Sequence, residues 1–252
     1  MQTETLIIGA GICGLSTAHF LSKRTSKFLL VESSSHLGGV IQSKHINNFI
    51  CENGPNTVLL NNKATIELIK DLDLWGDICY PKDETNKIRY VFNEGRLRKI
   101  PNSILKFLSS DLISTKSKIC LFSELFKSKH SENTTVYNFI KKRFGKEIHD
   151  KLFEPFLTGI YAGDTRQMSA KHTLKNLWKF EQKHGSIFKA ILFENIRRSS
   201  SFNFPKGLQH MIDTLGKSLK NNILKKTEVN KIFKSKGGYE VLVNNKYKIK
   251  CK

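Results

Sequence analysis

The sequence LIIGAGICGL, residues 6–15, decides the fold of the first part of the chain. It places Gly9, Gly11 and Gly14 in the spacing G-x-G-x-x-G directly after an apolar run. The apolar run predicts a short buried strand, and the glycines predict a tight turn that opens a helix. A second apolar run, KFLLVE, ends at Glu32. This order of strand, turn, helix and strand predicts a β-α-β unit of a Rossmann-like parallel sheet.

The same residues predict a dinucleotide site. Gly9 permits the tight turn, Gly11 lets the backbone approach a pyrophosphate, and Gly14 allows the helix and strand to pack closely. The helix N-terminus would offer N–H groups to the anion. Glu32 would accept hydrogen bonds from ribose hydroxyls, and its charge disfavours the 2′-phosphate of NADP. From this unit alone, both FAD and NAD remain candidates.

Two further stretches favour FAD. The stretch HLGGVIQS contains the pair Gly38 and Gly39, and CENGPN contains Gly54, Pro55 and Asn56. Flavoproteins of the amine-oxidase type have a glycine pair and a later glycine-proline turn in this order, where the chain passes close to the flavin. We therefore expect these five residues to line an FAD site together with the first glycine loop.

Beyond these motifs, the sequence resembles one family, the oxygen-dependent, FAD-containing protoporphyrinogen oxidases. The stretch LFEPFLTGIYAGDTRQMSAKHTLKNLWKFEQKHGSI, residues 152–187, resembles a long segment of that family, and FPKGLQHMIDTL and TEVNKI with YEVLV resemble its later helix and strands. The resemblance covers essentially the whole chain. Members of that family are much longer, so we expect its activity only if the missing half is supplied.

The resemblance implies an α/β fold in which a helical region interrupts the FAD-binding domain. Residues 1–82 would form the first part of the FAD-binding domain, residues 83–204 a hairpin and a mainly helical substrate and membrane region, and residues 205–252 the return to the FAD-binding domain.

The resemblance also implies substrate and cofactor contacts. Arg89, in IRYVFNEGRLRKIP, would pair with a substrate propionate, since a guanidinium matches a carboxylate. Gly159 would offer a backbone carbonyl to a pyrrole N–H, and Val229 would contact the cofactor. The stretch around Arg89 itself predicts a β-hairpin.

The reaction implied is the oxidation of protoporphyrinogen IX to protoporphyrin IX by dioxygen. Hydride would leave a bridging carbon for flavin N5, so no catalytic side chain is expected. Three alternatives stay open. The substrate could be coproporphyrinogen, the chain could be another amine-oxidase-type flavoprotein, or it could be an inactive fragment that binds FAD or a membrane.

The charge and the cysteine content of the sequence indicate which partners the protein binds and where in the cell it works. The net charge is +20, and residues 99–252 carry 31 basic against 12 acidic side chains. We expect an anionic membrane surface as a partner, and a homodimer is left open. Nucleic acid is not expected, because no binding motif accompanies the charge. The five cysteines are odd in number and contain no C-x-x-C pair, which predicts no metal site and a cytoplasmic protein, soluble or peripheral on a membrane.

Overall fold

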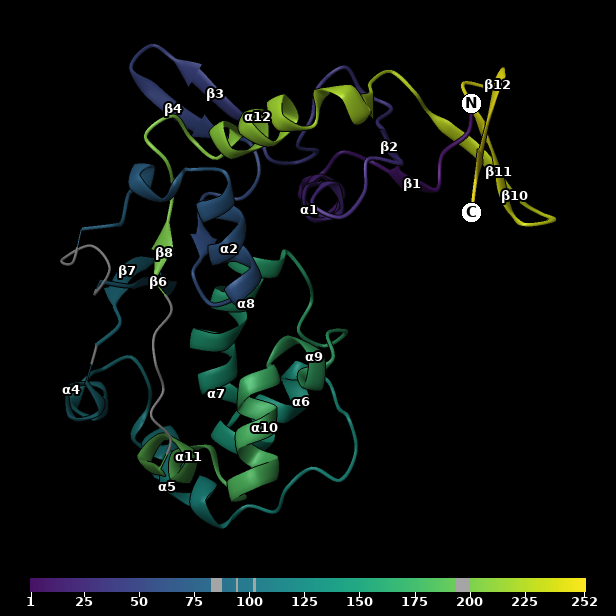
Figure 1. Ribbon diagram of the computed structural model, residues 1–252. Coiled ribbons are helices and arrows are strands. Elements are labelled where there is room, and N and C mark those ends of the chain that lie inside the picture. The colour runs from purple at the N-terminus through teal and green to yellow at the C-terminus, as the bar shows by residue number, and fades with distance from the viewer. Residues whose placement is uncertain (83–87, 94, 102, 194–199) are drawn as a thin grey trace. The chain divides into compact units, whose positions relative to one another are not determined.

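The computed structural model of the 252-residue chain describes residues 1–82, 88–93, 95–101, 103–193 and 200–252 (Figure 1). The chain divides into two compact units. Unit 1 comprises Met1–Pro81 and Ser199–Lys252, and unit 2 comprises Lys82–Arg198. Unit 1 is therefore assembled from the two ends of the sequence, with unit 2 inserted between them.

Unit 1 contains most of the strands. Its elements in chain order are β1 (Thr5–Ile8), α1 (Ile12–Ser22), β2 (Phe28–Val31), β3 (Ser43–Ile46), β4 (Phe49–Glu52), β5 (Val58–Leu59), α2 (Lys63–Asp71), η1 (Trp75–Asp77), β8 (Ser201–Phe202), α12 (Gln209–Ser218), η4 (Lys220–Asn222), β9 (Ile223–Leu224), β10 (Val229–Ser235), β11 (Gly238–Val243) and β12 (Tyr247–Cys251).

The central sheet of unit 1 is parallel and has the strand order β1-β2-β9. The predicted β-α-β unit is confirmed by β1, α1 and β2. Leu15 and Ala18 of α1 are fully buried, as are Ile212 and Leu215 of α12, in one apolar core that also takes in α2. The core therefore lies between the sheet and its helices, which is the arrangement of an α/β fold.

A second sheet is antiparallel, with the order β10-β11-β12. The end of the sequence, from residue 227 on, predicts two or three strands separated by turns at 237–238 and 244–245, and β10, β11 and β12 confirm this prediction. Val241, Val243 and Ile249 form the buried side of this sheet and pack with Val31 of β2. Both chain ends lie beside β12 (Figure 1), where Thr3 N–H donates to the Lys250 carbonyl at 3.0 Å.

Two expectations for unit 1 are corrected. The apolar spacing over residues 63–74 predicts an amphipathic helix across the whole stretch. The helix ends at Asp71, because Asp73 adopts a left-handed φ of 56° while Leu72 and Leu74 turn into the core. The stretch RRSSSF, residues 197–202, predicts a turn or a linker. Its first three residues lie outside the described ranges, and Ser201–Phe202 forms β8, which pairs with β5. Residues 200–204 accordingly belong with unit 1, where Phe202 and Phe204 are buried.

Unit 2 is mainly helical. Its elements are β6 (Tyr90–Asn93), β7 (Arg96–Lys99), α4 (Ile104–Ser109), α5 (Thr115–Ser123), η2 (Glu124–Phe126), α6 (Val136–Phe144), α7 (Lys146–Ile148), the π-helix η3 (His149–Phe153), α8 (Glu154–Tyr161), α9 (Ala170–Thr173), α10 (Lys175–His184) and α11 (Ile187–Phe193). The predicted hairpin is confirmed by β6 and β7, although Glu94 in its turn lies outside the described residues.

Three helices of unit 2 start at side-chain caps, and its helices pack around one core. Ser103, Ser114 and Thr135 each accept a hydrogen bond from a backbone N–H in the first turn of α4, α5 and α6. Val136, Phe139 and Ile140 of α6 are fully buried in the core of this unit. Within the described residues, we find no helix that has both the length and the apolar character needed to cross a bilayer.

Candidate cofactor site

The first glycine loop joins β1 to α1. Gly9 has a left-handed φ of 91°, and its N–H donates to the Val31 carbonyl at 2.8 Å. A Cβ added to Gly14 would lie 2.0 Å from the Gly9 carbonyl oxygen. Only glycine therefore allows the first turn of α1 to pack on the loop.

Gly11 faces open space at the start of α1. Its φ is −67°, and a Cβ added there would meet no atom within 4 Å. Helix α1 begins without a side-chain cap and without an acidic residue in its first turn. The first N–H groups of a helix lack intrahelical acceptors, so this end of α1 is suited to bind an anion.

Glu32 follows β2 directly and is buried. Its Oε2 accepts from Ala10 N–H at 2.7 Å, while its Oε1 accepts from the N–H and hydroxyl of Ser34 at 2.8 and 2.6 Å. Burial raises the pKa of the Glu32 carboxyl, but the hydrogen bonds from Ser34, Ala10 and Ser33 outweigh it and lower the pKa to about 2. The carboxylate is thus held ionised beside the glycine loop, where it can accept hydrogen bonds from hydroxyls and repels phosphate.

The second glycine segment lies against the first. Gly38 N–H donates to the Ala10 carbonyl at 2.8 Å. Gly38 has a φ of 103°, and a Cβ added to it would lie 2.9 Å from Cγ2 of Ile212 in α12. A Cβ added to Gly39 would lie 3.5 Å from the Cα of Gly11. The two segments are therefore in contact, with α12 packed behind the second one.

The third glycine segment lies against the second. A Cβ added to Gly54 would lie 2.2 Å from the carbonyl oxygen of Val40, so only glycine fits this position. The N–H of Asn53 donates to the Gln42 carbonyl at 2.8 Å. Pro55 and Asn56 follow on the surface of unit 1. The three glycine segments are thus consecutive neighbours in space, as they are in the sequence.

Val229 lies at the Glu32 side of this arrangement. It is the first residue of β10 and packs with Val31. Two residues earlier, Thr227 N–H donates to the Glu32 carbonyl at 2.8 Å, and Lys226 N–H donates to the Ser34 carbonyl at 3.1 Å. The structure therefore places all ten expected cofactor residues in unit 1, and contacts connect the three glycine segments to one another and to Glu32.

The two expected substrate residues lie in unit 2. Arg89 is exposed at the start of the β6–β7 hairpin, and its Nη1 donates to the Ile88 carbonyl at 2.9 Å. Gly159 lies in the last turn of α8, where a Cβ would meet no atom within 4 Å. Phe156, Ile160 and Tyr161 beside it are each more than half exposed, so this face of α8 is apolar and open.

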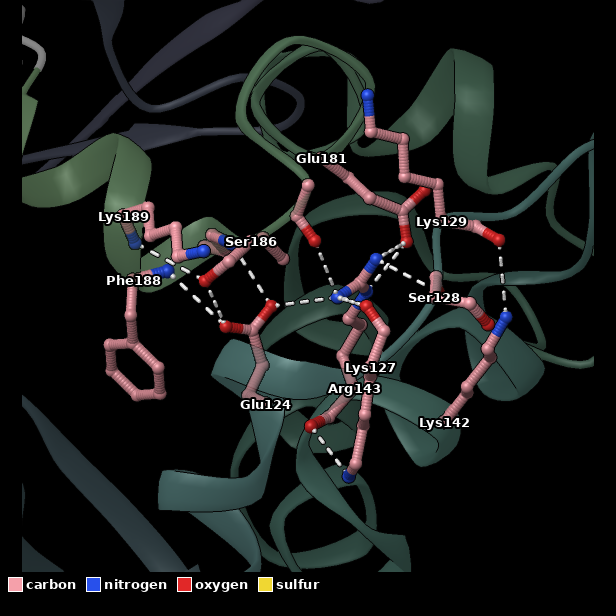
Figure 2. Close-up of polar contacts among 12 residues, drawn as sticks. Glu124, Lys127, Ser128, Lys129, Lys142, Arg143, Glu181, Ser186, Phe188 and Lys189 are labelled. Carbon is pink, nitrogen blue, oxygen red and sulfur yellow. Dashed lines mark hydrogen bonds and ion pairs between the residues drawn. The ribbon is translucent and has the colours of Figure 1, made fainter.

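Sequence reasoning missed a buried ionic cluster in unit 2, drawn in Figure 2. The Arg143 side chain is fully buried, as are those of Glu124 and Glu181. Its Nε donates to Glu181 Oε1 at 2.6 Å and its Nη1 to Glu124 Oε1 at 3.1 Å. Glu124 also accepts from the Ile187 N–H at 2.9 Å and from the Ser186 hydroxyl, at the start of α11. The cluster links α6, η2, α10 and α11. One feature of the sequence could have predicted the burial of Arg143. It follows Ile140 by three residues and Phe139 by four, so helical spacing places it on the buried face of α6.

A second cluster surrounds the π-helix. His149 is buried, and its ring nitrogens contact Asp150 at 2.7 Å and the Thr165 hydroxyl at 3.0 Å. Glu154 lies near enough for the three groups to approach one metal, but Arg166 is 3.8 Å from Glu154 and Lys146 is 3.5 Å from Asp150. These cations and the engaged imidazole fit a cluster that fastens η3 to the loop at Thr165.

The fold and the glycine segments define a dinucleotide-binding α/β protein. The family model for flavin containing amine oxidoreductases matches residues 12–252, and the chain belongs to this family. The expectation of FAD rather than NAD is thereby confirmed.

The chain is similar to porphyrinogen oxidases. It is 29% identical to coproporphyrinogen III oxidase of Bacillus subtilis over 97% of this chain and 57% of that protein. It is 29% identical to protoporphyrinogen oxidase 2 of Arabidopsis thaliana over 86% of this chain and 47% of that protein. The chain thus spans about half the length of the curated relatives it matches.

Solved structures share the fold. An Exiguobacterium sp. 255-15 protein, named provisionally as a protoporphyrinogen oxidase, matches 96% of this chain and 56% of its own, with a TM-score of 0.81 at 23% identity. A putrescine oxidase bound to putrescine matches 100% of this chain and 57% of its own, with a TM-score of 0.69 at 16% identity.

Proposed function

We propose that unit 1 binds FAD and that the chain is part of a porphyrinogen oxidase. The observation that carries the proposal is the contact of three glycine segments, around Gly11, Gly39 and Gly54, in one row that starts beside Glu32. Glycines are required where a backbone must approach an extended ligand closely.

The residues fit FAD from one end to the other. Glu32 and Val229 would contact the adenosine end, with the Glu32 carboxylate accepting from ribose hydroxyls. Gly9, Gly11 and Gly14 would bring the start of α1 to the pyrophosphate, since the space in front of Gly11 would be filled by any side chain there. Gly38, Gly39, Gly54, Pro55 and Asn56 would follow the cofactor toward the flavin.

Porphyrinogen is the substrate class that the relatives favour, since several curated ones are porphyrinogen oxidases by name. Arg89 would bind a propionate through its guanidinium. Gly159 would accept a pyrrole N–H, because carbonyls in the last turn of a helix lack intrahelical donors. The exposed apolar face of α8, with Phe156 and Ile160, would cover part of a large apolar ring.

When held by the glycine segments and Glu32, FAD would supply the hydride acceptor for a porphyrinogen and the route for electrons to dioxygen. The chain's own contribution is to hold the two molecules. The ionised Glu32 fixes the cofactor at its adenosine end, and Arg89 fixes the substrate by its charge.

We further propose that α5 and η2 bind an anionic membrane surface. Ile119, Phe122 and Phe126 are 66%, 59% and 88% exposed, and they follow one another at helical spacing. Lys116 is exposed at the start of the same stripe, and Lys129 is exposed beyond its end. Apolar side chains flanked by lysines are the combination that binds anionic lipid.

The first test is the visible absorption spectrum of the purified chain after addition of FAD and removal of excess cofactor. A flavin spectrum at close to one FAD per chain supports the cofactor site, and a colourless protein rejects it. Oxidation of protoporphyrinogen IX and of coproporphyrinogen III is then followed by porphyrin fluorescence. Turnover of one of these two porphyrinogens supports the oxidase activity and identifies the substrate. If FAD is bound but neither porphyrinogen is oxidised, the chain binds the cofactor without catalysing the reaction alone.

A further inference from the structure

The Glu52 carboxylate is the centre of a polar cluster in unit 1. Its Oε1 accepts from the Leu208 N–H at 2.9 Å and from the Asn203 side-chain amide at 3.2 Å. Its Oε2 accepts from the Ser43 hydroxyl at 2.7 Å. The Ser43 oxygen in turn accepts from the Gln209 N–H at 3.0 Å. Glu52 and Ser43 therefore cap the start of α12.

Asn203 extends the cluster to the glycine-proline turn. Its Nδ2 donates both to Glu52 and to the carbonyl oxygen of Asn56, the latter at 2.9 Å. The backbone of Asn203 is fixed by two hydrogen bonds to the backbone of Cys79, at 2.8 and 3.0 Å. The Asn56 carbonyl is thus connected to Glu52 through a side chain that is itself held in place.

The backbone at Gly207 lies very close to the side chains of Ser43 and Glu52. Gly207 is buried with a φ of 80°, and an added Cβ would lie 2.3 Å from the Ser43 hydroxyl oxygen and 3.0 Å from Glu52 Oε1. The same helix, α12, contacts the second glycine segment through Ile212 at Gly38. Helix α12 is therefore fastened to both the second and the third glycine segments.

We propose that Glu52 and Asn203 are positioning residues of the cofactor site. Through α12 and Asn56, they fix the turn at residues 53–56 against the Gly38–Gly39 segment. They would thereby determine where the flavin ring of bound FAD lies. The inference rests on the proposed binding of FAD.

The test is titration of the full chain with FAD, together with quenching of the bound flavin's fluorescence by iodide. We expect Glu52→Ala and Asn203→Ala each to raise the Kd for FAD about tenfold, because each leaves polar partners unpaired. Iodide quenching should rise in the same two variants. Glu52→Gln should stay within about threefold of the parent chain, because its amide oxygen still accepts from Leu208 and Asn203. Glu67→Ala, at an exposed glutamate of α2, is the matched control.

Values for Glu52→Ala and Asn203→Ala that equal the Glu67→Ala control overturn the proposal. If the parent chain binds no FAD, the proposed function fails, and amide hydrogen exchange at single residues of the cofactor-free chain decides the positioning role. Faster exchange at Asn53 in both variants, with none in Glu67→Ala, then supports it. Faster exchange confined to Leu208 and Gln209 overturns it, since Glu52 would only cap α12. Asn203→Ala keeps the cap and so remains informative if Glu52→Ala does not fold.

Discussion

The main-chain N–H of Ala10 and the Oε2 atom of Glu32 lie 2.7 Å apart and form a buried hydrogen bond. Ala10 stands between Gly9 and Gly11, so this bond ties the glycine loop to the acid that follows β2. The glycine loop and the Glu32 carboxylate, which would face the pyrophosphate and the ribose under the proposed function, are thus held at a fixed spacing by the protein itself.

The hydrogen bonds that Glu32 accepts from Ser34, Ala10 and Ser33 make the stability of the chain depend on pH, because together they outweigh the effect of burial on its pKa. The pKa of Glu32 is lowered from 4.5 to about 2, so its contribution is complete well above pH 4.5 and is lost as the pH falls toward 2. The full contribution is roughly 3 kcal/mol, and about half of it is lost by pH 3. We expect Glu32→Gln to destabilise the chain in urea at pH 6 and to do so by clearly less at pH 3. Glu67→Gln serves as the control, and an equal loss at both pH values would contradict the prediction.

Replacing two glycines of one loop by alanine should affect two different properties: Gly14→Ala should lower stability, and Gly11→Ala should weaken FAD binding. Gly14→Ala should lower the free energy of unfolding by about 3 kcal/mol, because its methyl group would meet the Gly9 carbonyl. Gly11→Ala should change it by less than about 0.5 kcal/mol, since the methyl group meets nothing. The same methyl group should weaken FAD binding by about tenfold or more, because it occupies the approach to α1. Urea unfolding and FAD titration check both, and unchanged FAD affinity in Gly11→Ala would sink the proposed pyrophosphate contact.

Arg143→Lys should destabilise unit 2 by about 3 kcal/mol or more, because one ammonium cannot replace the guanidinium between two buried carboxylates. The matched control is Arg166→Lys, at a side chain that is 57% exposed, for which we expect less than about 1 kcal/mol. Hydrogen exchange of α6 and α10 amides measures the effect within unit 2. Similar values for the two variants would show that the cluster is not a main source of stability.

Phe126→Ser and Phe122→Ser should each reduce binding of the chain to phosphatidylserine vesicles by about fivefold or more, because each removes a large exposed apolar side chain. Vesicle sedimentation at low and high salt is the measurement. Phe233→Ser, in β10 of unit 1, is the control and should bind as the parent chain does. Equal binding by all three variants would exclude this face as the membrane contact.

Local patterns in the sequence were enough to predict the β-α-β unit, the β6–β7 hairpin and the last three strands. In each of these, a turn of glycine or asparagine separates apolar runs, so neighbouring residues determine the structure. The glycine motifs also marked the segments that lie against one another, because those glycines are needed for contacts between consecutive segments.

What the sequence did not reveal depends on contacts between distant residues. The β3–β4 hairpin is exposed almost throughout, so it lacks the alternation that marks a half-buried strand. The two-residue strands β5 and β8 exist only through their pairing with each other. Arg143 follows two exposed lysines, and nothing in that local run of basic residues predicts that its side chain is buried. Its burial depends on Glu124 and Glu181, which come from other helices.

The insertion of unit 2 into unit 1 has a consequence for synthesis on the ribosome. Strand β9, at Ile223–Leu224, is the third strand of the parallel sheet and pairs with β2, which is translated long before it. Helix α12, which packs on α1, is also translated after all of unit 2. The helical unit is contiguous in sequence and can fold while the nascent glycine loop still lacks the part of its core that comes from β8 and α12. The apolar residues of β1, β2 and α1 therefore stay partly exposed while unit 2 is being translated. Exposed apolar surface on a nascent chain favours aggregation, so we expect this early segment to need chaperone protection.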